Sequence, residues 1–266
     1  MAALLIRPGM AAEPEEAVKD AVVYIWHDQR RMLTSPLRIN RVDLLVWGTT
    51  LGSVIYLAPR WGAARSADER IEQGIHREDN GLGHFLRDFT HVGDAPVLFG
   101  ASVLGYGVGR WQDMPGLRRG SLHLFEGLMD AGIAAEMIKM LAGRRRPVDR
   151  PSRGPFLGPR GFFGDSENDS FPSGHATFTF ATATILSHES GSYWVGVPAY
   201  MLAGGISYSR IYVEKHWLSD VLSGAVLGYS VGILVEHQRH SKPQLAGRFY
   251  PTLTQDSVGV AWTRQF

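Results

Sequence analysis

The sequence predicts a mainly α-helical fold: a bundle of about six core helices, an N-terminal amphipathic helix and a short C-terminal β-strand. Three observations support this fold class. Several segments of helical length are separated by stretches rich in Gly, Pro and polar residues. Larger residues alternate with smaller or polar ones in the C-terminal tail, a pattern that favours a strand. With 44% hydrophobic and 20% charged residues, the 266-residue chain can bury a sizeable core.

The first element is an amphipathic helix within an N-terminal extension, residues 1–38. Between Glu15 and Met32, apolar residues fall on one stripe at helical spacing: Val18, Ala21, Val22 and Ile25. We favour docking of this helix on the core over anchoring at a membrane surface. The preceding MAALLIRPGMAAEP resembles a truncated secretion signal, but its apolar run is short and Arg7 interrupts it.

The helical core is expected over residues 39–240. The charged segment from Arg60 to Leu86 favours a helix with irregular flanks. Further helices are expected over residues 84–109, 120–142, 174–187, 194–208 and 217–236. Residues 144–172 form a long loop, dense in Gly, Pro and charge, of the kind that often carries function. In the tail, residues 241–266, the alternation around Val258–Phe266 predicts a strand.

Composition excludes several classes of protein. A formal charge of +1 gives no general electrostatic reason to bind nucleic acid. The absence of cysteine excludes disulfides, thiol catalysis and cysteine-bound metal. No stretch reaches the ~18–20 consecutive apolar residues of a clear spanning helix. Glu126, Asp130 and Glu136 would also be costly against lipid. We therefore favour a soluble or partly embedded bundle over an integral membrane protein.

Three blocks carry the residues expected to do chemistry. In the first, KMLAGRRRP, Lys139 and Arg146 would share a helix face if the helix persisted, but Pro147 indicates that it has ended. A run such as RRR is usually surface charge. In the second, FPSGHA, Ser173 is suited to cap a helix that begins near Gly174. The free amides of that terminus would cradle phosphate, with His175 at the rim.

The third block is SRIYVEKHWLSD. His216 and Asp220 are four residues apart at a predicted helix start, so they share a face. A carboxylate in that position can accept from one imidazole nitrogen, which leaves the other nitrogen more nucleophilic. Arg210 can grip phosphate oxygens with two hydrogen bonds. His84 and His91, which flank FLRDFT, are interpreted as surface histidines.

In this order the blocks resemble the signature of the type 2 phosphatidic acid phosphatase and vanadium haloperoxidase superfamily. KMLAGRRRP fits K-x6-R-P, FPSGHA contains P-S-G-H, and SRIYVEKHWLSD fits S-R-x5-H-x3-D. The resemblance implies that His216 is a nucleophile oriented by Asp220, and that His175 protonates the leaving oxygen and later helps to activate water. It implies phosphate binding by a set of side chains and one backbone amide: Lys139, Arg146, Arg210, Ser173 and the Gly174 N–H. No metal or other cofactor is implied for this chemistry.

We therefore expect a metal-independent phosphatase of the cell envelope, periplasmic or membrane-associated, that forms a phosphohistidine. Its substrates would be phosphate monoesters or pyrophosphates, with lipid phosphates favoured by the loop aromatics Phe156, Phe162 and Phe163. Anchoring the loop to the core is an equally good role for these rings. The alternatives are an acid phosphatase for small phosphomonoesters, a haloperoxidase that binds vanadate through His216, and a non-catalytic membrane-associated protein. No oligomeric state is predicted.

Overall fold

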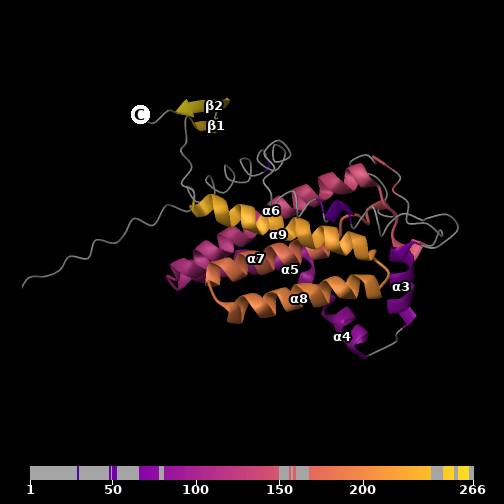
Figure 1. Ribbon diagram of the computed structural model, residues 1–266. Coiled ribbons are helices and arrows are strands. Elements are labelled where there is room, and N and C mark those ends of the chain that lie inside the picture. Colours follow the sequence, from indigo (N-terminus) through magenta and orange to yellow (C-terminus); the bar gives the residue numbers. More distant parts are fainter. Residues whose placement is uncertain are drawn as a thin grey trace, which may run out of the picture.

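The computed structural model confirms the mainly helical fold (Figure 1). It describes residues 29, 48, 50–52, 66–77, 81–149, 156, 158–159, 168–240, 248–254 and 257–263. Almost all of the N-terminal amphipathic helix predicted from Glu15 to Met32 lies outside these residues, as do Phe162 and Phe163. The tail forms an antiparallel pair of strands, β1 (Arg248–Thr254) and β2 (Ser257–Thr263), so the predicted strand is confirmed over Val258–Thr263.

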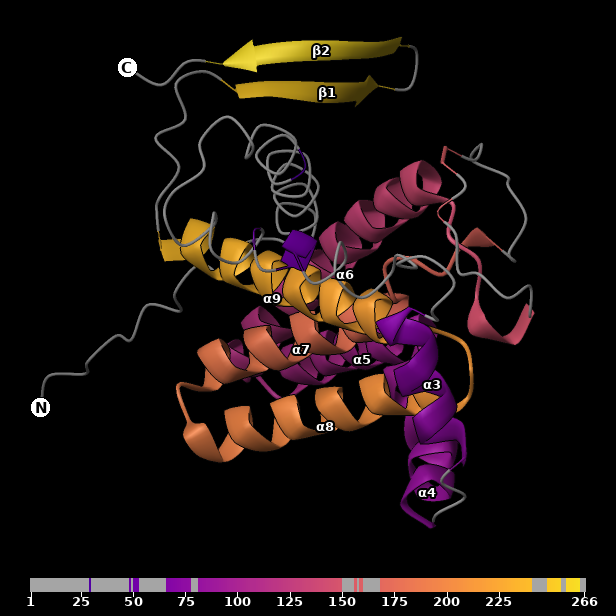
Figure 2. The ribbon, with the colours of Figure 1, turned by 45° about the vertical axis from the view of Figure 1, so that its right-hand side comes forward.

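Five long helices make up the described part of the bundle, with shorter helices at one end (Figure 2). The long helices are α5 (Ala95–Trp111), α6 (Pro115–Ala142), α7 (Gly174–Ser190), α8 (Tyr193–Tyr212) and α9 (Leu218–His240). The shorter helices are α3 (Ala67–Arg77), α4 (Gly81–Phe89) and the 3₁₀ turns η2 (Thr90–Gly93) and η3 (Pro147–Asp149).

Two expected helices differ from the observed ones because of proline. The helix predicted over residues 84–109 is broken: α4 ends at Phe89, η2 follows, and Asp94 has extended backbone before α5. Pro96 stands in the first turn of α5, a position that favours the start of a new helix. Similarly, α6 begins at Pro115 and not near residue 120, because proline is well suited to the first helical position.

The centre of the bundle is α7, which packs against α6, α8 and α9. Small and branched residues fill the space between α6, α7 and α9: Ala131, Ala135, Ala181, Val231 and Val235. A glycine stripe on α9 (Gly224, Gly228 and Gly232) allows especially close approach to α7. A Cβ atom on any of the three would overlap atoms of α7 or of its N-cap residue Ser173, including backbone oxygens at the first two. The close contact keeps the start of α7 beside the start of α9.

Because the long helices alternate in direction, the three sequence blocks lie at the same end of the bundle. The chain arrives along α6, leaves along α7, returns along α8 and leaves again along α9 (Figure 2). One end of the bundle therefore holds the ends of α6 and α8 and the starts of α7 and α9; we call it the motif end. Ser173 N donates to the Asp220 carbonyl oxygen over 3.0 Å, which joins the second block to the third. The other end, where α7 meets α8, is called the far end.

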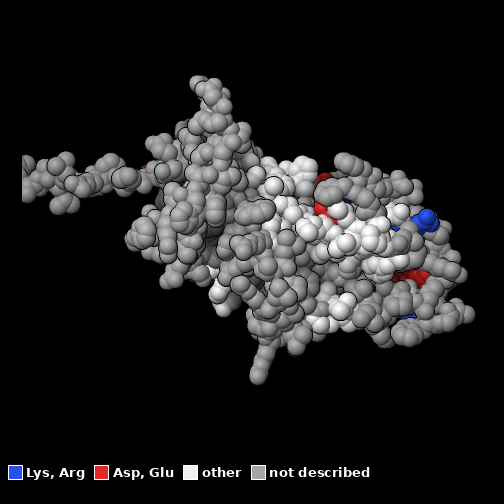
Figure 3. Space-filling view, turned by 90° about the horizontal axis from the view of Figure 1, so that it is seen from above, with Lys and Arg blue, Asp and Glu red and all other residues white. Residues whose placement is uncertain are grey.

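Membrane-compatible surfaces are present in the described part of the chain. The segment Leu218–His237 of α9 is long and apolar enough to cross a membrane, with a mean hydropathy of 1.7, although 56% of that window is buried in the bundle. Ser219, Ser223 and Ser230 interrupt its apolar run, so this segment has no long stretch of consecutive apolar residues. Most described atoms on the face in Figure 3 belong to residues other than Lys, Arg, Asp and Glu. Large apolar side chains are also exposed along α5 and α8.

Candidate active site

The first block supplies two cations from different elements. Helix α6 ends at Ala142 with Gly143 in the left-handed conformation (φ 53°), so Lys139 and Arg146 do not share a helix face. The Lys139 Nζ atom donates to Glu136 Oε1 over 2.7 Å and lies 3.7 Å from where a Cβ would stand on Gly174. Arg146, in the loop, donates through Nε to Asp169 Oδ1 over 2.6 Å. The structure thus brings Lys139 to the start of α7.

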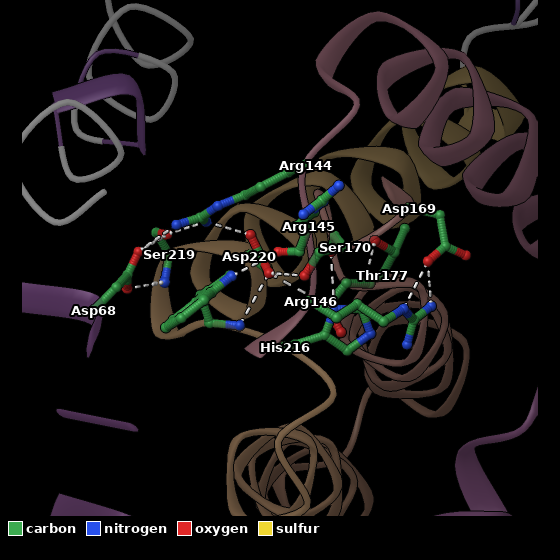
Figure 4. A network of polar contacts seen from close by, with 12 residues as sticks. Asp68, Arg144, Arg145, Arg146, Asp169, Ser170, Thr177, His216, Ser219 and Asp220 are labelled. Carbon is green, nitrogen blue, oxygen red and sulfur yellow. Dashed lines mark hydrogen bonds and ion pairs between the residues drawn. The ribbon is translucent and has the colours of Figure 1, made fainter. Parts of the chain in front are cut away.

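Arg144 is buried, which makes the interpretation of the RRR run as surface charge wrong for this residue. Its guanidinium contacts Asp220 and donates to Ser219 Oγ (2.6 Å) and Asp68 Oδ2 (2.7 Å). Figure 4 shows it reaching across from the loop to both carboxylates. The Phe156 ring covers the guanidinium at 4.8 Å, so Phe156 helps to anchor the loop while its side chain remains partly exposed. Arg144 therefore ties α3, the loop and α9 together.

The second block starts α7 as predicted, but the serine does not cap it. Ser173 has extended backbone (φ −68°, ψ 114°) and makes no side-chain capping hydrogen bond. Its Oγ is buried and has no hydrogen-bond partner among the described residues. The first amides of a helix, here from Gly174 onward, lack intrahelical acceptors and lie at the positive end of the dipole. An unused hydroxyl and these amides are suited to an anion.

His175 is held by a carboxylate that the sequence analysis did not single out. Its Nε2 atom is hydrogen-bonded to Asp94 Oδ1 over 2.8 Å, and Asp94 Oδ2 is hydrogen-bonded to His91 Nδ1 over 2.9 Å. Burial and the nearby Arg210 lower the pKa of His175 to about 4, against the opposing effect of Asp94. His91 is largely exposed, as predicted for a surface histidine, but it also contacts this carboxylate.

His216 in the third block is held by a backbone carbonyl. Its Nδ1 atom lies 2.8 Å from the Ser170 carbonyl oxygen and 3.8 Å from Asp220 Oδ2 (Figure 4). The expected direct hydrogen bond from His216 to Asp220 is therefore wrong, because 3.8 Å is too long. A carbonyl oxygen only accepts, so Nδ1 carries the proton and Nε2 keeps its lone pair. Burial lowers the pKa of His216, which favours the neutral, nucleophilic form.

Hydrogen bonds through Ser170 link Asp220 to His216. Its Oδ2 atom accepts from Ser170 Oγ over 2.5 Å and from the Trp217 amide over 2.9 Å, and the carboxylate also contacts Arg144. Asp220 thus caps the start of α9 and fixes the segment whose carbonyl holds His216. Nothing in the sequence pattern marked Ser170, which lies 46 residues before His216.

Arg210 brings the third cation of the site from the last turn of α8. One terminal nitrogen lies 3.4 Å from Thr90 Oγ1, and the buried Nε has no hydrogen-bond partner among the described residues. Arg210 interacts electrostatically with His175, His216 and Arg146. The motif end therefore gathers cations, an unused hydroxyl and helix amides around two imidazoles, which can bind a multiply charged anion and attack it.

A second buried histidine lies at the far end. His123 Nδ1 contacts Glu189 Oε1 and lies 4.0 Å from Glu236 Oε1. These residues come from α6, α7 and α9, and one donor atom of each lies within 4.8 Å of the others. Glu189 is 15 residues along α7 from Gly174, or roughly 22 Å at the helical rise. We call this group the far-end cluster, and it is separate from the phosphate-type site.

Comparison with known proteins gives the same family as the sequence blocks. Residues 120–243 match the model of the PAP2 superfamily. The chain is 34% identical over 161 residues to a lipid A 1-phosphatase of Porphyromonas gingivalis, covering 58% of this chain and 31% of that protein. It is 33% identical over 131 residues to a decaprenylphosphoryl-5-phosphoribose phosphatase of Mycobacterium tuberculosis, covering 46% of this chain and 63% of that protein. The chain thus spans less than two thirds of each of these relatives.

A solved structure shares the fold. The transmembrane PAP2 type phosphatidylglycerolphosphate phosphatase from Bacillus subtilis superposes with a TM-score of 0.54, at 21% sequence identity, over 76% of this chain and 98% of that one. The region matched by the family model contains all three sequence blocks and every predicted site residue. Residues 120–243 of this chain thus match the PAP2 superfamily, the family that the three sequence blocks resemble.

Proposed function

We propose that this protein is a metal-independent phosphatase of the cell envelope that hydrolyses lipid phosphate monoesters or pyrophosphates through a phosphohistidine. The observation that carries the proposal is the state of His216: Nδ1 is bound to the Ser170 carbonyl, so Nε2 is free to attack. The two relatives named above support a phosphorylated lipid as substrate, since one is a lipid A 1-phosphatase and the other a decaprenylphosphoryl-5-phosphoribose phosphatase.

The reaction has two displacement steps at phosphorus. In the first, His216 Nε2 forms a bond to phosphorus, the bond to the leaving oxygen breaks, and His175 gives that oxygen a proton. In the second, His175 takes a proton from water as the water oxygen bonds to phosphorus. The phosphorus–nitrogen bond then breaks, its electron pair returns to Nε2, and inorganic phosphate is released.

Phosphate binding falls to the groups that the structure leaves around the start of α7. Ser173 Oγ and Arg210 Nε are buried donors without partners among the described residues. With the Gly174 amide, Lys139 and Arg146, they would hold the equatorial oxygens and stabilise charge in the transition state. The Arg146 guanidinium donates a hydrogen bond to Asp169. We therefore expect its remaining N–H groups to bind the substrate phosphate while this contact persists.

A membrane location is supported by the outer surfaces of α5 and α8. Trp111, Tyr193 and Trp194 are 81%, 89% and 90% exposed, and all lie toward the far end. Aromatic residues of this kind favour a membrane–water interface. The exposed Leu104 and Met201 lie between these rings and the motif end. Lipid contact along this face would place the phosphate site near the opposite interface.

For the domain organisation, we propose a catalytic domain over residues 39–240, with residues 1–38 and 241–266 as extensions.

The test is phosphate release in detergent micelles, with a lipid phosphate monoester, a prenyl pyrophosphate and p-nitrophenyl phosphate compared by kcat/KM. We expect release with EDTA present and a preference for the lipids. A preference for the aryl ester would reject the lipid assignment, and complete loss of turnover in EDTA would reject the metal-free mechanism. The far-end cluster contains metal-type ligands, so the unfolding midpoint is measured in the same buffers to separate inhibition from unfolding.

A further inference from the structure

Asp94 stands at a break between two helical segments, where its side chain would ordinarily cap the next helix. It is the N-cap residue of α5, and aspartate is among the strongest capping residues. Its carboxylate nevertheless makes no capping hydrogen bond to α5. Both of its oxygens are used elsewhere, Oδ1 on His175 Nε2 and Oδ2 on His91 Nδ1. The carboxylate is therefore directed at the phosphate site and not at its own helix.

The contact between Asp94 and His175 joins two parts of the chain that are 81 residues apart. Asp94 lies outside residues 120–243, so the family match does not include it. His175 is in the first turn of α7, beside the amides proposed to bind phosphate. A carboxylate that accepts from one imidazole nitrogen fixes the ring orientation and leaves the other nitrogen, Nδ1, for the substrate.

We propose that Asp94 is a positioning residue for His175, which it orients and supports as the proton donor to the leaving oxygen. This inference rests on the proposed phosphatase function and extends it to a residue outside the family domain. The two imidazoles of the site are then held differently, His216 by a neutral carbonyl and His175 by a carboxylate. A neutral acceptor suits a nucleophile, whereas an anionic acceptor suits a group that must carry a proton.

The charges around His175 show why an anionic partner is needed. Arg210 from α8 and His216 before α9 disfavour its protonated form, as does burial, while Asp94 favours it. Lys139 from α6 lies near Gly174, and Arg146 interacts with both Arg210 and His216. Among these groups, Asp94 is the carboxylate that bonds directly to His175. Its removal would leave the proposed acid among cations, with only the substrate phosphate to favour protonation.

A defect in the acid has a signature that a folding defect lacks: it depends on the leaving group. p-Nitrophenolate leaves without a proton, whereas the alkoxide of an alkyl or lipid phosphate requires one. We expect Asp94→Asn to lower kcat/KM about 10–100-fold for a lipid phosphate and less than about threefold for p-nitrophenyl phosphate. The loss of activity at high pH should also move about one unit toward lower pH for the lipid substrate.

Asp88→Asn is the matched control, because Asp88 is exposed and pairs with its neighbour Arg87. It should leave both substrates unaffected, and Asp94→Glu should recover part of the lipid activity. Equal losses on both substrates in Asp94→Asn, or no loss on either, would overturn the inference. If Asp94→Asn fails to fold, the ratio of lipid phosphate activity to p-nitrophenyl phosphate activity is compared in Asp94→Glu and His91→Gln. A lower ratio than in the unaltered protein supports the inference, and an unchanged ratio in both variants overturns it. A wild-type protein that releases no phosphate from any substrate would instead reject the proposed function itself.

Discussion

The two ends of the bundle each bury a histidine, in opposite electrostatic surroundings. At the motif end, His216 is held by a carbonyl and interacts with Arg146 and Arg210. At the far end, His123 contacts Glu189 and lies near Glu236. Helices α6, α7 and α9 supply residues to both ends, so helix packing does not explain the difference. The difference teaches that the surroundings of an imidazole bias its charge: a carbonyl partner and nearby cations favour the neutral ring, and neighbouring carboxylates favour the protonated one.

The largest expected effect is on turnover, when His216 and His123 are each replaced by glutamine in separate variants. His216→Gln should lower turnover at least about a thousand-fold, because it removes the attacking nitrogen. His123→Gln should leave kcat within about twofold, since the far-end cluster is remote from the phosphate site. Phosphate release per folded protein, with folding checked by circular dichroism, measures both. Phosphate binding should persist in His216→Gln, because the cations and amides remain.

Either of two results would break this comparison. Turnover in His216→Gln close to that of the unaltered protein would reject His216 as the nucleophile. A loss of turnover in His123→Gln with the fold intact would show that the far-end cluster acts on the motif end.

A second comparison sets a buried arginine at the motif end against an exposed one at the far end. Arg144→Met should lower the free energy of unfolding by about 3–5 kcal/mol, because it leaves Asp68 and Asp220 buried without their shared cation. Arg119, which is 66% exposed, lies 3.5 Å from Glu189. Arg119→Met should cost less than about 1 kcal/mol, because solvent screens the pair. Denaturant unfolding in detergent measures both variants, and equal effects would contradict the assigned burial.

The site residues that could be predicted from the sequence lie in short blocks of recognisable chemistry, whereas the others stand out only through contacts made in the fold. Lys139, Ser173, His175 and His216 could be singled out from the sequence because each lies in a short block with a chemical meaning. Arg144 was missed because a run of arginines is usually solvated, and its carboxylate partners are each 76 residues away.

Asp94 and Ser170 were missed for a related reason. Asp94 lies inside the continuous helix that the sequence predicts over residues 84–109, whereas Pro96 favours a new helix start there. Ser170 acts partly through its backbone carbonyl, which no side-chain pattern encodes. The helices followed from local periodicity, with boundaries shifted at prolines. The hydrogen bonds that orient His175 and His216 depend on tertiary contacts between distant segments.

The smallest expected effect is the dependence of stability on pH at the motif end. Folding lowers the pKa of His175 from 6.5 to about 4 and lowers that of His216 as well. Between pH 7 and pH 5 the unfolded chain therefore binds protons that the native protein does not, so the free energy of unfolding falls as pH falls. For His175 this loss is on the order of 1–2 kcal/mol. Denaturant unfolding at a series of pH values measures the slope.

The variant His175→Gln isolates this contribution from that of other titrating groups. Glutamine does not titrate, so the free energy of unfolding should fall less between pH 7 and pH 5 in the variant than in the unaltered protein. The substitution should therefore change this free energy less at pH 7 than at pH 5. A slope unchanged by His175→Gln would mean that His175 keeps its ordinary pKa in the native protein. Asp94 would then just offset burial and Arg210, and His175 would be half-protonated near pH 6.5 before any substrate arrives. A steeper slope in the variant would mean that His175 gains protons on folding, so that the effect of Asp94 outweighs those of burial and Arg210. The pH series therefore measures how strongly Asp94 competes with the surrounding cations, without using catalysis as the readout.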